Sequence, residues 1–234
     1  MNLTYLGHGS FLLETKGKKL LIDPFISPNP LVAELSDEQK AKLDVNTIEA
    51  DYILLTHGHE DHVADAEAIA KRTGATIISS FEIVSYYGAK GINGHPMNLG
   101  GKFSFDFGTL KYVAAVHSSV LPDGTYAANP GGFVVWNEEG CIYLAGDTAL
   151  TMDMKLIPMT CPKLDLAVLP IGDNFTMGYE DAVIASDFIE CNKVVGCHFD
   201  TFGYIKIDQE EAQKAFADKG KELILLPITE SIAI

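Results

Sequence analysis

The sequence predicts an α/β protein in which two β-sheets face each other and helices cover their outer faces. Three observations support this fold class: a strand-rich amino-terminal stretch, a largely β middle at about 97–148, and helix–strand alternation in both halves. Helices that follow strands in both halves are expected to pack on the outer faces of paired sheets. The chain has no low-complexity linker and no repeat, so we expect residues 1–234 to form a single domain.

The amino-terminal third begins with short apolar runs. The runs at residues 3–6, 10–14 and 19–22 are separated by glycines and predict three strands of a meander. Prolines then open a loop before an expected helix at 36–43. The run at 51–56 is too continuously apolar to have one wet face, so it predicts a buried strand.

A β-α-β passage follows this buried strand. Val63, Ala66 and Ile69 recur at helical spacing and predict a helix over 62–73, which a glycine ends. Residues 76–79 predict the next strand.

The middle of the chain reads mainly as β-structure. Phe103, Phe105 and Phe107 alternate with polar residues, which is typical of β-structure. Two apolar runs at 132–136 and 141–145 flank a short polar turn and predict a hairpin.

The last third returns to helix–strand alternation. Apolar runs predict strands at 164–170, 194–197 and 223–227, and longer amphipathic stretches predict helices at 179–190 and 209–219.

Composition and charge exclude several classes of protein. The formal net charge is −15 and no basic stripe is present, so nucleic acid is not an expected partner. No run of about 18 to 20 apolar residues occurs, and the first residues read as a strand, so neither a membrane span nor an export signal is expected. Four cysteines without a C-x-x-C pair fit a reducing compartment. We therefore expect a cytoplasmic protein that acts on a small molecule, and a homo-oligomer is compatible with the sequence.

The residues that carry the chemistry cluster at the end of the buried strand. The sequence reads Thr-His-Gly-His-Glu-Asp-His over residues 56–62, which places four metal-ligating side chains within six residues. The pattern H-x-H-x-D-H is expected by chance in roughly one such chain in a few thousand, which makes a polar turn without metal the weaker interpretation. His57 and His59 can point the same way from an extended segment. Asp61 and His62 begin a helix and can reach a second, nearby centre.

Three further candidate ligands each follow an apolar run: His117, Asp147 and His198. Each alone is a weak signal, because an isolated His or Asp at a strand end is more often a hydrogen-bonded structural group. Since four ligands do not fill two metal sites, we expect two divalent ions held by His57, His59, Asp61, His62, His117, Asp147 and His198. Imidazole and carboxylate together favour Zn²⁺, with Mn²⁺ or Fe²⁺ as alternatives.

Four more polar residues lie in segments that can reach this centre. His8, between two glycines, is a candidate catalytic residue that either supports the metal ligands or contacts substrate, or it only fixes a turn. Asp23 precedes a proline and either supports a ligating histidine through a hydrogen bond or forms an Asp-Pro turn. Asp173 and Asn174 follow an apolar strand and either line a substrate pocket or begin a loop.

Five short motifs carry a family resemblance. They are T-H-G-H-E-D-H at 56–62, A-G-D-T around Asp147, G-C-H-F around His198, and the early L-G-H-G-S with L-I-D-P at 6–10 and 21–24. Together they resemble the metallo-β-lactamase superfamily over nearly the whole chain. The early motifs are similar to small bacterial metal-dependent hydrolases of unassigned substrate and to the ascorbate-phosphate lactonases. The resemblance implies a four-layer αβ/βα sandwich of two mixed β-sheets with helices on the outer faces.

The resemblance also implies how the ligands divide between two ions. It assigns the first ion to His57, His59 and His117. It assigns the second ion to Asp61, His62 and His198, with Asp147 as the bridge. Neighbouring branches fit less well: true β-lactamases are exported, the flavin-partnered di-iron members carry an added domain, and the tRNA-processing members need a basic surface.

The predicted function is a metal-dependent hydrolase that uses water activated by two metal ions on a small ester, lactone or phosphoester. Asp61 is expected to orient that water while serving as a ligand. Two alternatives stay open, a metal-binding protein without turnover and a di-iron redox protein. The full set of seven ligands favours the hydrolase.

Overall fold

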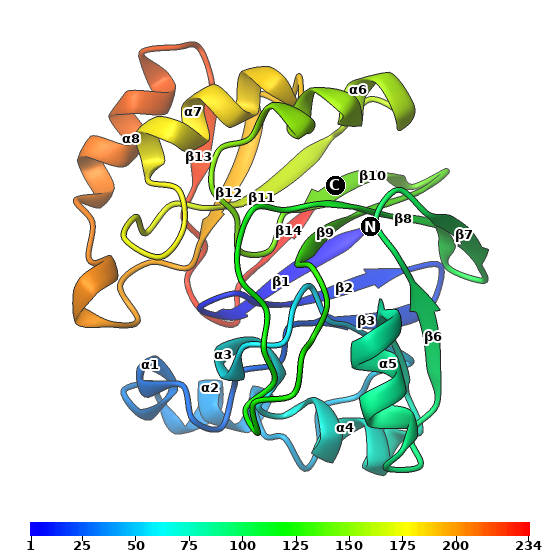
Figure 1. Ribbon diagram of the computed structural model, residues 1–234. Helices are drawn as coiled ribbons and strands as arrows, with labels where there is room; N and C mark the ends of the chain where they lie inside the picture. The colour runs from blue at the N-terminus through cyan, green and yellow to red at the C-terminus, as the bar shows by residue number, and fades with distance from the viewer.

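Two β-sheets of seven strands each face one another in the computed structural model, which describes residues 1–234 (Figure 1). The first sheet contains, in spatial order, β14 (Ser231–Ala233), β1 (Asn2–Gly7), β2 (Ser10–Thr15), β3 (Lys18–Ile22), β4 (Tyr52–Leu54), β5 (Thr76–Ser80) and β6 (Gly94–Met97). The second contains, in spatial order, β13 (Glu222–Ile224), β12 (Lys193–Cys197), β11 (Leu166–Pro170), β10 (Gly140–Leu144), β9 (Gly131–Asn137), β8 (Gly108–Ala114) and β7 (Lys102–Phe105).

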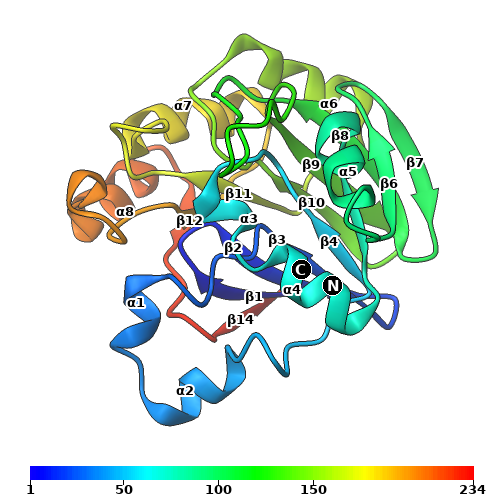
Figure 2. The same ribbon diagram turned by 60° about the horizontal axis from the view of Figure 1, so that its bottom comes forward.

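Helices cover the outer face of each sheet (Figures 1 and 2). On the side of the first sheet lie α1 (Pro30–Ala33), α2 (Asp37–Lys42), α3 (Glu60–Val63), α4 (Ala66–Thr73) and α5 (Phe81–Gly88). On the side of the second lie α6 (Leu156–Thr160), α7 (Tyr179–Phe188) and α8 (Gln209–Ala217), and short 3₁₀ turns occupy Met152–Lys155 and Gly203–Ile205. The predicted two-sheet sandwich with outer helices is confirmed. No helix combines the length and the apolar composition that crossing a bilayer would need.

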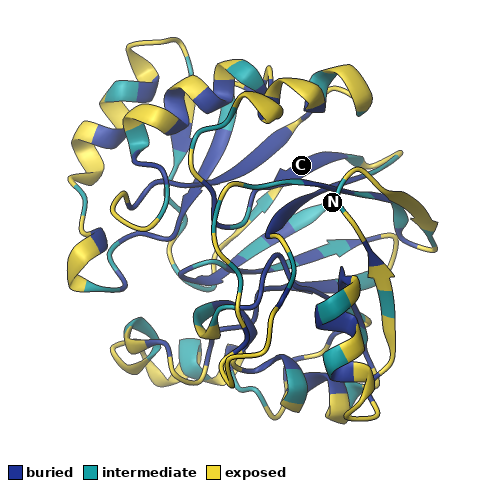
Figure 3. Cartoon of the chain, viewed as in Figure 1, coloured by how far each residue is buried: buried dark blue, intermediate teal, exposed yellow.

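The core consists of three apolar layers. One layer lies between the two sheets and includes Leu13 and Phe133. A second lies between the first sheet and its helices and includes Ile69, and a third lies under α7 and α8 and includes Phe216. Figure 3 shows the same division, with buried strands inside and exposed residues on the outer sides of the helices. Each sheet is therefore held on both faces, which gives the loops at its edges a rigid base.

Strand direction determines which strand ends meet. β3 to β6 are mutually parallel, and so are β10 to β13. β1 runs with β3 because both are antiparallel to β2, and β8 runs with β10 because both are antiparallel to β9. The carboxyl ends of β1, β3 and β4 therefore lie at one edge of the first sheet. Those of β8, β10 and β12 lie at one edge of the second.

The predicted helix over 62–73 is wrong in its continuity, because the structure divides it into α3 and α4. The break centres on Asp65, whose carboxylate accepts hydrogen bonds from the backbone N–H groups of Ile26 (2.7 Å) and Ser27 (2.9 Å). Its own N–H donates to the carbonyl of Pro24. Asp65 thus holds the loop that follows β3, and the helix is interrupted at this residue.

The sequence did not predict α5 or β14. Helix α5 is rich in β-branched and aromatic residues, which have low helix propensity, but it buries Ile83, Val84 and Tyr87 against the core. Strand β14 has three residues and pairs with the start of β1, from Asn2 opposite Ala233 onward. Both elements depend on tertiary packing, which local sequence patterns do not report.

Candidate metal centre

Six of the candidate residues follow the carboxyl ends of six strands. At the edge of the first sheet these are His8 after β1, Asp23 after β3 and His57 after β4. At the edge of the second sheet they are His117 after β8, Asp147 after β10 and His198 after β12. His59 directly precedes α3, and Asp61 and His62 lie in its first turn. The structure therefore brings all the candidate ligands from both sheets to one place.

Unusual backbone conformations make this approach possible. Gly146 has φ +63, and a Cβ atom there would lie 2.7 Å from Cβ of Thr56, so the chain needs glycine at this point. His8 (φ 58), Asp23 (φ 44) and His198 (φ 56) also have left-handed backbone. Non-glycine residues adopt this region at a cost, and such strain concentrates at functional sites.

Three imidazoles form one compact group, which we call the three-histidine group: His57, His59 and His117. Nδ1 of His59 lies 3.0 Å from Nε2 of His57 and 3.3 Å from Nε2 of His117. The three nitrogens therefore face a common point, as ligands of one ion do. His59 and His117 are partly exposed, so this group is open to solvent on one side.

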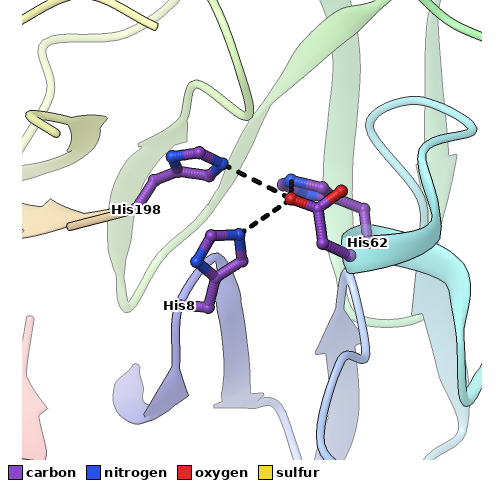
Figure 4. A group of neighbouring side chains, drawn as sticks. His8, His62 and His198 are labelled. Atoms are coloured by element: carbon purple, nitrogen blue, oxygen red, sulfur yellow. Dashed lines mark hydrogen bonds and ion pairs between the residues drawn. The ribbon is translucent and has the colours of Figure 1, made fainter. Parts of the chain in front are cut away.

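A second cluster of ligand atoms comprises one carboxylate and three imidazoles, those of Asp61, His8, His62 and His198. We call Asp61, His62 and His198 the Asp61 group. Oδ2 of Asp61 lies 3.6 Å from Nε2 of His198 and 3.8 Å from Nε2 of His62. His8 adjoins the group, with its Nε2 3.0 Å from the same oxygen. Figure 4 shows the rings of His8 and His198 directed at this carboxylate.

Asp147 lies between the two groups. Its Oδ2 is 3.1 Å from Nε2 of His198 and 3.5 Å from Nε2 of His117, and its Oδ1 is 3.4 Å from Nε2 of His62. One carboxylate thus contacts histidines of both groups, which is the geometry that a bridging ligand requires.

Two of the candidate ligand atoms lack hydrogen-bond partners within the protein. The Nε2 atoms of His62 and His198 are buried and make no hydrogen bond of normal geometry, although carboxylates lie close by. Buried polar atoms without partners are rare in proteins, and an ion between these residues would satisfy both.

Most of the outward-facing ring nitrogens are held by other groups, as is usual for metal-ligating histidines. Nδ1 of His57 lies 3.0 Å from Oγ1 of Thr56, and Nε2 of His59 lies 3.3 Å from Oγ of Ser118. Nδ1 of His62 lies 2.9 Å from Oδ2 of Asp23. Nδ1 of His198, by contrast, is buried without a hydrogen-bond partner.

Comparison with known proteins identifies the family. The model of the beta-lactamase superfamily domain matches residues 2–198. A "UPF0173 metal-dependent hydrolase" of Flavobacterium johnsoniae is 61% identical over 234 residues, which are 100% of both chains. The chain belongs to this family. The predicted resemblance to the superfamily and to its small metal-dependent hydrolases is confirmed.

Solved structures agree with this family membership. Igni18, described as a novel metallo hydrolase from Ignicoccus hospitalis, is 31% identical, with a TM-score of 0.86 over 100% of this chain and 97% of its own. CmlA, a diiron β-hydroxylase from Streptomyces venezuelae, is 12% identical, with a TM-score of 0.69 over 100% of this chain and 54% of its own. The second likeness shows the fold alone.

Burial keeps the histidines of the three-histidine group neutral. It lowers the pKa of His57 well below its usual value, and the nearby His62 lowers it further. Burial also lowers the pKa of His59 and of His117, against the opposing effect of nearby carboxylates. Neutral imidazole is the form that binds a metal ion.

In the Asp61 group, neighbouring charges outweigh burial in determining the pKa values. Burial lowers the pKa of both histidines, but the nearby carboxylate of Asp147 raises the pKa of His198 to about 9. The carboxylates of Asp147 and Asp23 raise the pKa of His62 well above its usual value. Burial would likewise raise the pKa of Asp61, but the close contacts of its carboxylate with His198 and His8 outweigh burial and hold that pKa low. Without metal, protonated imidazoles therefore balance the carboxylates.

Of the remaining candidate residues, Asp23 lies at the centre, whereas Asp173 and Asn174 lie outside it. Asp23 makes the predicted hydrogen bond to a candidate ligand, His62. Asp173 and Asn174 are exposed, have left-handed backbone, and belong to neither group. The backbone N–H of Asn174 donates a hydrogen bond to Oδ1 of Asp173, which stabilises a tight loop.

Three hydroxyl residues at the centre escaped the sequence analysis: Thr56, Ser118 and Thr201. Each contacts a ring nitrogen of a histidine at 2.9–3.3 Å. Thr56 and Ser118 adjoin candidate ligands in the sequence, so adjacency was an available signal. Thr201 is close to His8 only through the fold.

Proposed function

We propose that this chain is a two-metal hydrolase that acts on a small ester, lactone or phosphoester. The proposed ligands of one ion are the three-histidine group, those of the other are the Asp61 group, and Asp147 bridges them. Zn²⁺ is the proposed metal, because imidazole and carboxylate donors together suit it, with Mn²⁺ or Fe²⁺ as alternatives. Family membership supports hydrolysis, and the geometry of the donors supports the pair of ions.

One observation carries the proposal most directly. The Nε2 atoms of His62 and His198 are buried without hydrogen-bond partners, and both lie within 3.8 Å of a carboxylate oxygen. A purely structural cluster would give these nitrogens aligned hydrogen bonds in addition to the nearby charges, because a buried polar atom without a hydrogen bond costs about 1–3 kcal/mol. Donors left open in this way favour a site prepared for cations.

The chain's own residues explain how a substrate would be handled. Bound divalent ions would supply Lewis acidity and a water of lowered pKa. Asp61 is more exposed than His62 and His198, so its carboxylate can orient an attacking water from the open side. The low pKa of Asp61 keeps it ionised and able to accept a hydrogen bond from that water. The general acid for the leaving group is not among these contacts.

The test is metal quantification coupled to a substrate panel. We expect the purified chain to hold two ions and to hydrolyse at least one member of a panel of phosphodiesters, lactones and thioesters. Chelation should stop hydrolysis, and added Zn²⁺ or Mn²⁺ should restore it. Failure of both metals to restore any rate would count against a catalytic site.

A single substitution sharpens this test. His59→Ala removes one donor of the three-histidine group, so we expect loss of one ion and a fall in activity of at least about 100-fold. His95→Ala is the matched control, because His95 packs against Phe103 and Phe105 away from the centre. Equal ion content and rates in the two variants would overturn the ligand assignment. Visible absorption from bound iron would instead point to the redox alternative.

A further inference from the structure

The turn after β1 carries a histidine that adjoins the Asp61 group but differs from it. His8 is fully buried, and both of its ring nitrogens have partners. Its Nε2 lies 3.0 Å from Oδ2 of Asp61, and its Nδ1 lies 2.9 Å from Oγ1 of Thr201. His62 and His198, by contrast, leave Nε2 unpartnered. Nε2 of His62 and of His198 is therefore left without a partner, which an ion could supply, whereas both nitrogens of His8 already have one.

The partners of His8 define its tautomer. A carboxylate only accepts hydrogen bonds, so Nε2 of the neutral ring carries the hydrogen and donates it to Asp61. Nδ1 is then an acceptor, and the Thr201 hydroxyl donates to it. Thr201 has one alternative acceptor, the carbonyl of Phe199, at a longer 3.3 Å. The Thr201 hydroxyl thus selects the ring form that holds Asp61.

His8 is also fixed by its backbone and by aromatic neighbours. Its carbonyl accepts a hydrogen bond from the N–H of His198 at 3.0 Å, and the two rings lie 4.1 Å apart. The rings of Phe25 and Phe202 approach His8 edge-on at 5.5 and 5.2 Å. This enclosure leaves His8 no exposed surface for a substrate to contact. Figure 4 shows that His8 and His198 approach the same carboxylate.

We propose that His8 and Thr201 are positioning residues for Asp61. The Thr201 hydroxyl fixes the ring of His8, and the ring holds the Asp61 carboxylate where His62 and His198 meet. The inference rests on the proposed function, because it requires the Asp61 group to hold an ion. It assigns His8 an effect through Asp61, with no contact to substrate.

The first experiment removes the Thr201 hydroxyl while keeping its volume. In Thr201→Val we expect Zn²⁺ affinity at the Asp61 group to fall by about 10–100-fold, as for other residues that orient metal ligands. The three-histidine group should keep its ion, and kcat should fall while KM is unchanged. Thr201→Ser should restore both properties. Thr4→Val is the matched control, because the Thr4 hydroxyl contacts only Ser231 at the surface.

The second experiment separates positioning from direct ligation. In His8→Gln the side-chain amide can still donate to Asp61 but is a poor metal ligand, whereas Leu at this position cannot donate. Both variants share the left-handed backbone of residue 8 and its cost. We expect His8→Gln to retain two Zn²⁺ ions and His8→Leu to retain one. Loss of an ion from His8→Gln, to the same extent as from His198→Ala, would make His8 a ligand and overturn the inference.

The outcomes distinguish this inference from the proposed function. A wild-type chain that binds no Zn²⁺ overturns both. A wild-type chain that binds two ions, beside Thr201→Val with unchanged affinity and kcat, overturns the positioning role alone. Circular dichroism of each variant shows that lost ions do not result from unfolding.

Discussion

The two halves of the centre differ in how their donors are supported. In the three-histidine group, His59 is partly exposed and its outward nitrogen lies against Ser118, an exposed hydroxyl residue. In the Asp61 group, His62 is buried and its outward nitrogen lies 2.9 Å from Asp23, a buried carboxylate. One half is thus neutral, with His59 open to solvent, and the other holds the charged, buried His62.

This difference suggests separate tasks within one site. A buried, hydrogen-bonded carboxylate fixes both the orientation and the tautomer of a ligating histidine, whereas an exposed hydroxyl does so weakly. We infer that the Asp61 group is preorganised, and that the three-histidine group has room to adapt when substrate arrives. Substitutions of the supporting residues should therefore have unequal effects.

The largest effect is expected where the two halves meet. Asp147→Asn removes the charge that contacts His62, His117 and His198, so both ion positions should weaken together. It also removes one of the buried counter-charges of the protonated His62 and His198, which is costly. We expect loss of both ions at micromolar Zn²⁺ and a fall in hydrolysis of at least about 100-fold. Ion content by mass spectrometry checks this, and loss of one ion alone would show that Asp147 is no bridge.

Asp23→Asn should act on the Asp61 group alone. An amide nitrogen in place of Oδ2 cannot accept a hydrogen bond from Nδ1 of His62. The neutral ring would then carry its hydrogen on Nε2, and Nε2 would have no lone pair left to bind a metal ion. We expect Zn²⁺ affinity at this group to fall by about 10–100-fold. Asp65→Asn is the control, because Asp65 is also buried but holds only the Ile26–Ser27 loop. Equal affinity losses in both variants would indicate general destabilisation.

The response to pH should also separate the halves. Without metal, the pKa of His198 is raised to about 9, whereas those of His57, His59 and His117 are lowered. Because an ion displaces the proton from His198, affinity at the Asp61 group should rise as pH increases toward about 9, by about tenfold per unit for each proton released. Affinity at the three-histidine group should be flat above neutral pH. Chelator competition between pH 6 and 10 measures both, and identical slopes would contradict the division of charge.

The sequence predicted much of the architecture and of the site, because both leave local patterns in it: apolar runs for the strands, and ligand-type residues directly after them for the site. Apolar runs located most strands, and ligand-type residues directly after such runs indicated the edge at which His117, Asp147 and His198 meet. The dense motif at 56–62 needed no long-range information. The two facing sheets followed from the alternation of elements, and the structure confirmed them.

Other features escaped because they arise from contacts between distant segments. Asp65 looked like an ordinary helical residue, yet its carboxylate serves a loop 38 to 39 residues earlier and breaks the helix. Thr201 lies 193 residues from His8, so no sequence pattern could pair them. The short strand β14 exists because β1 offers it an edge.

The smallest effect is expected from the open half of the centre. Ser118→Ala removes a single exposed hydroxyl at 3.3 Å from Nε2 of His59, and an exposed neutral hydrogen bond contributes about 0.5–1.5 kcal/mol or less. We therefore expect Zn²⁺ affinity at the three-histidine group to fall by no more than about tenfold. Ser85→Ala, which alters another exposed hydroxyl in α5, is the control. A loss as large as that of Asp23→Asn would remove the distinction between an adaptable half and a preorganised half, because it would show that both outward nitrogens are held equally firmly.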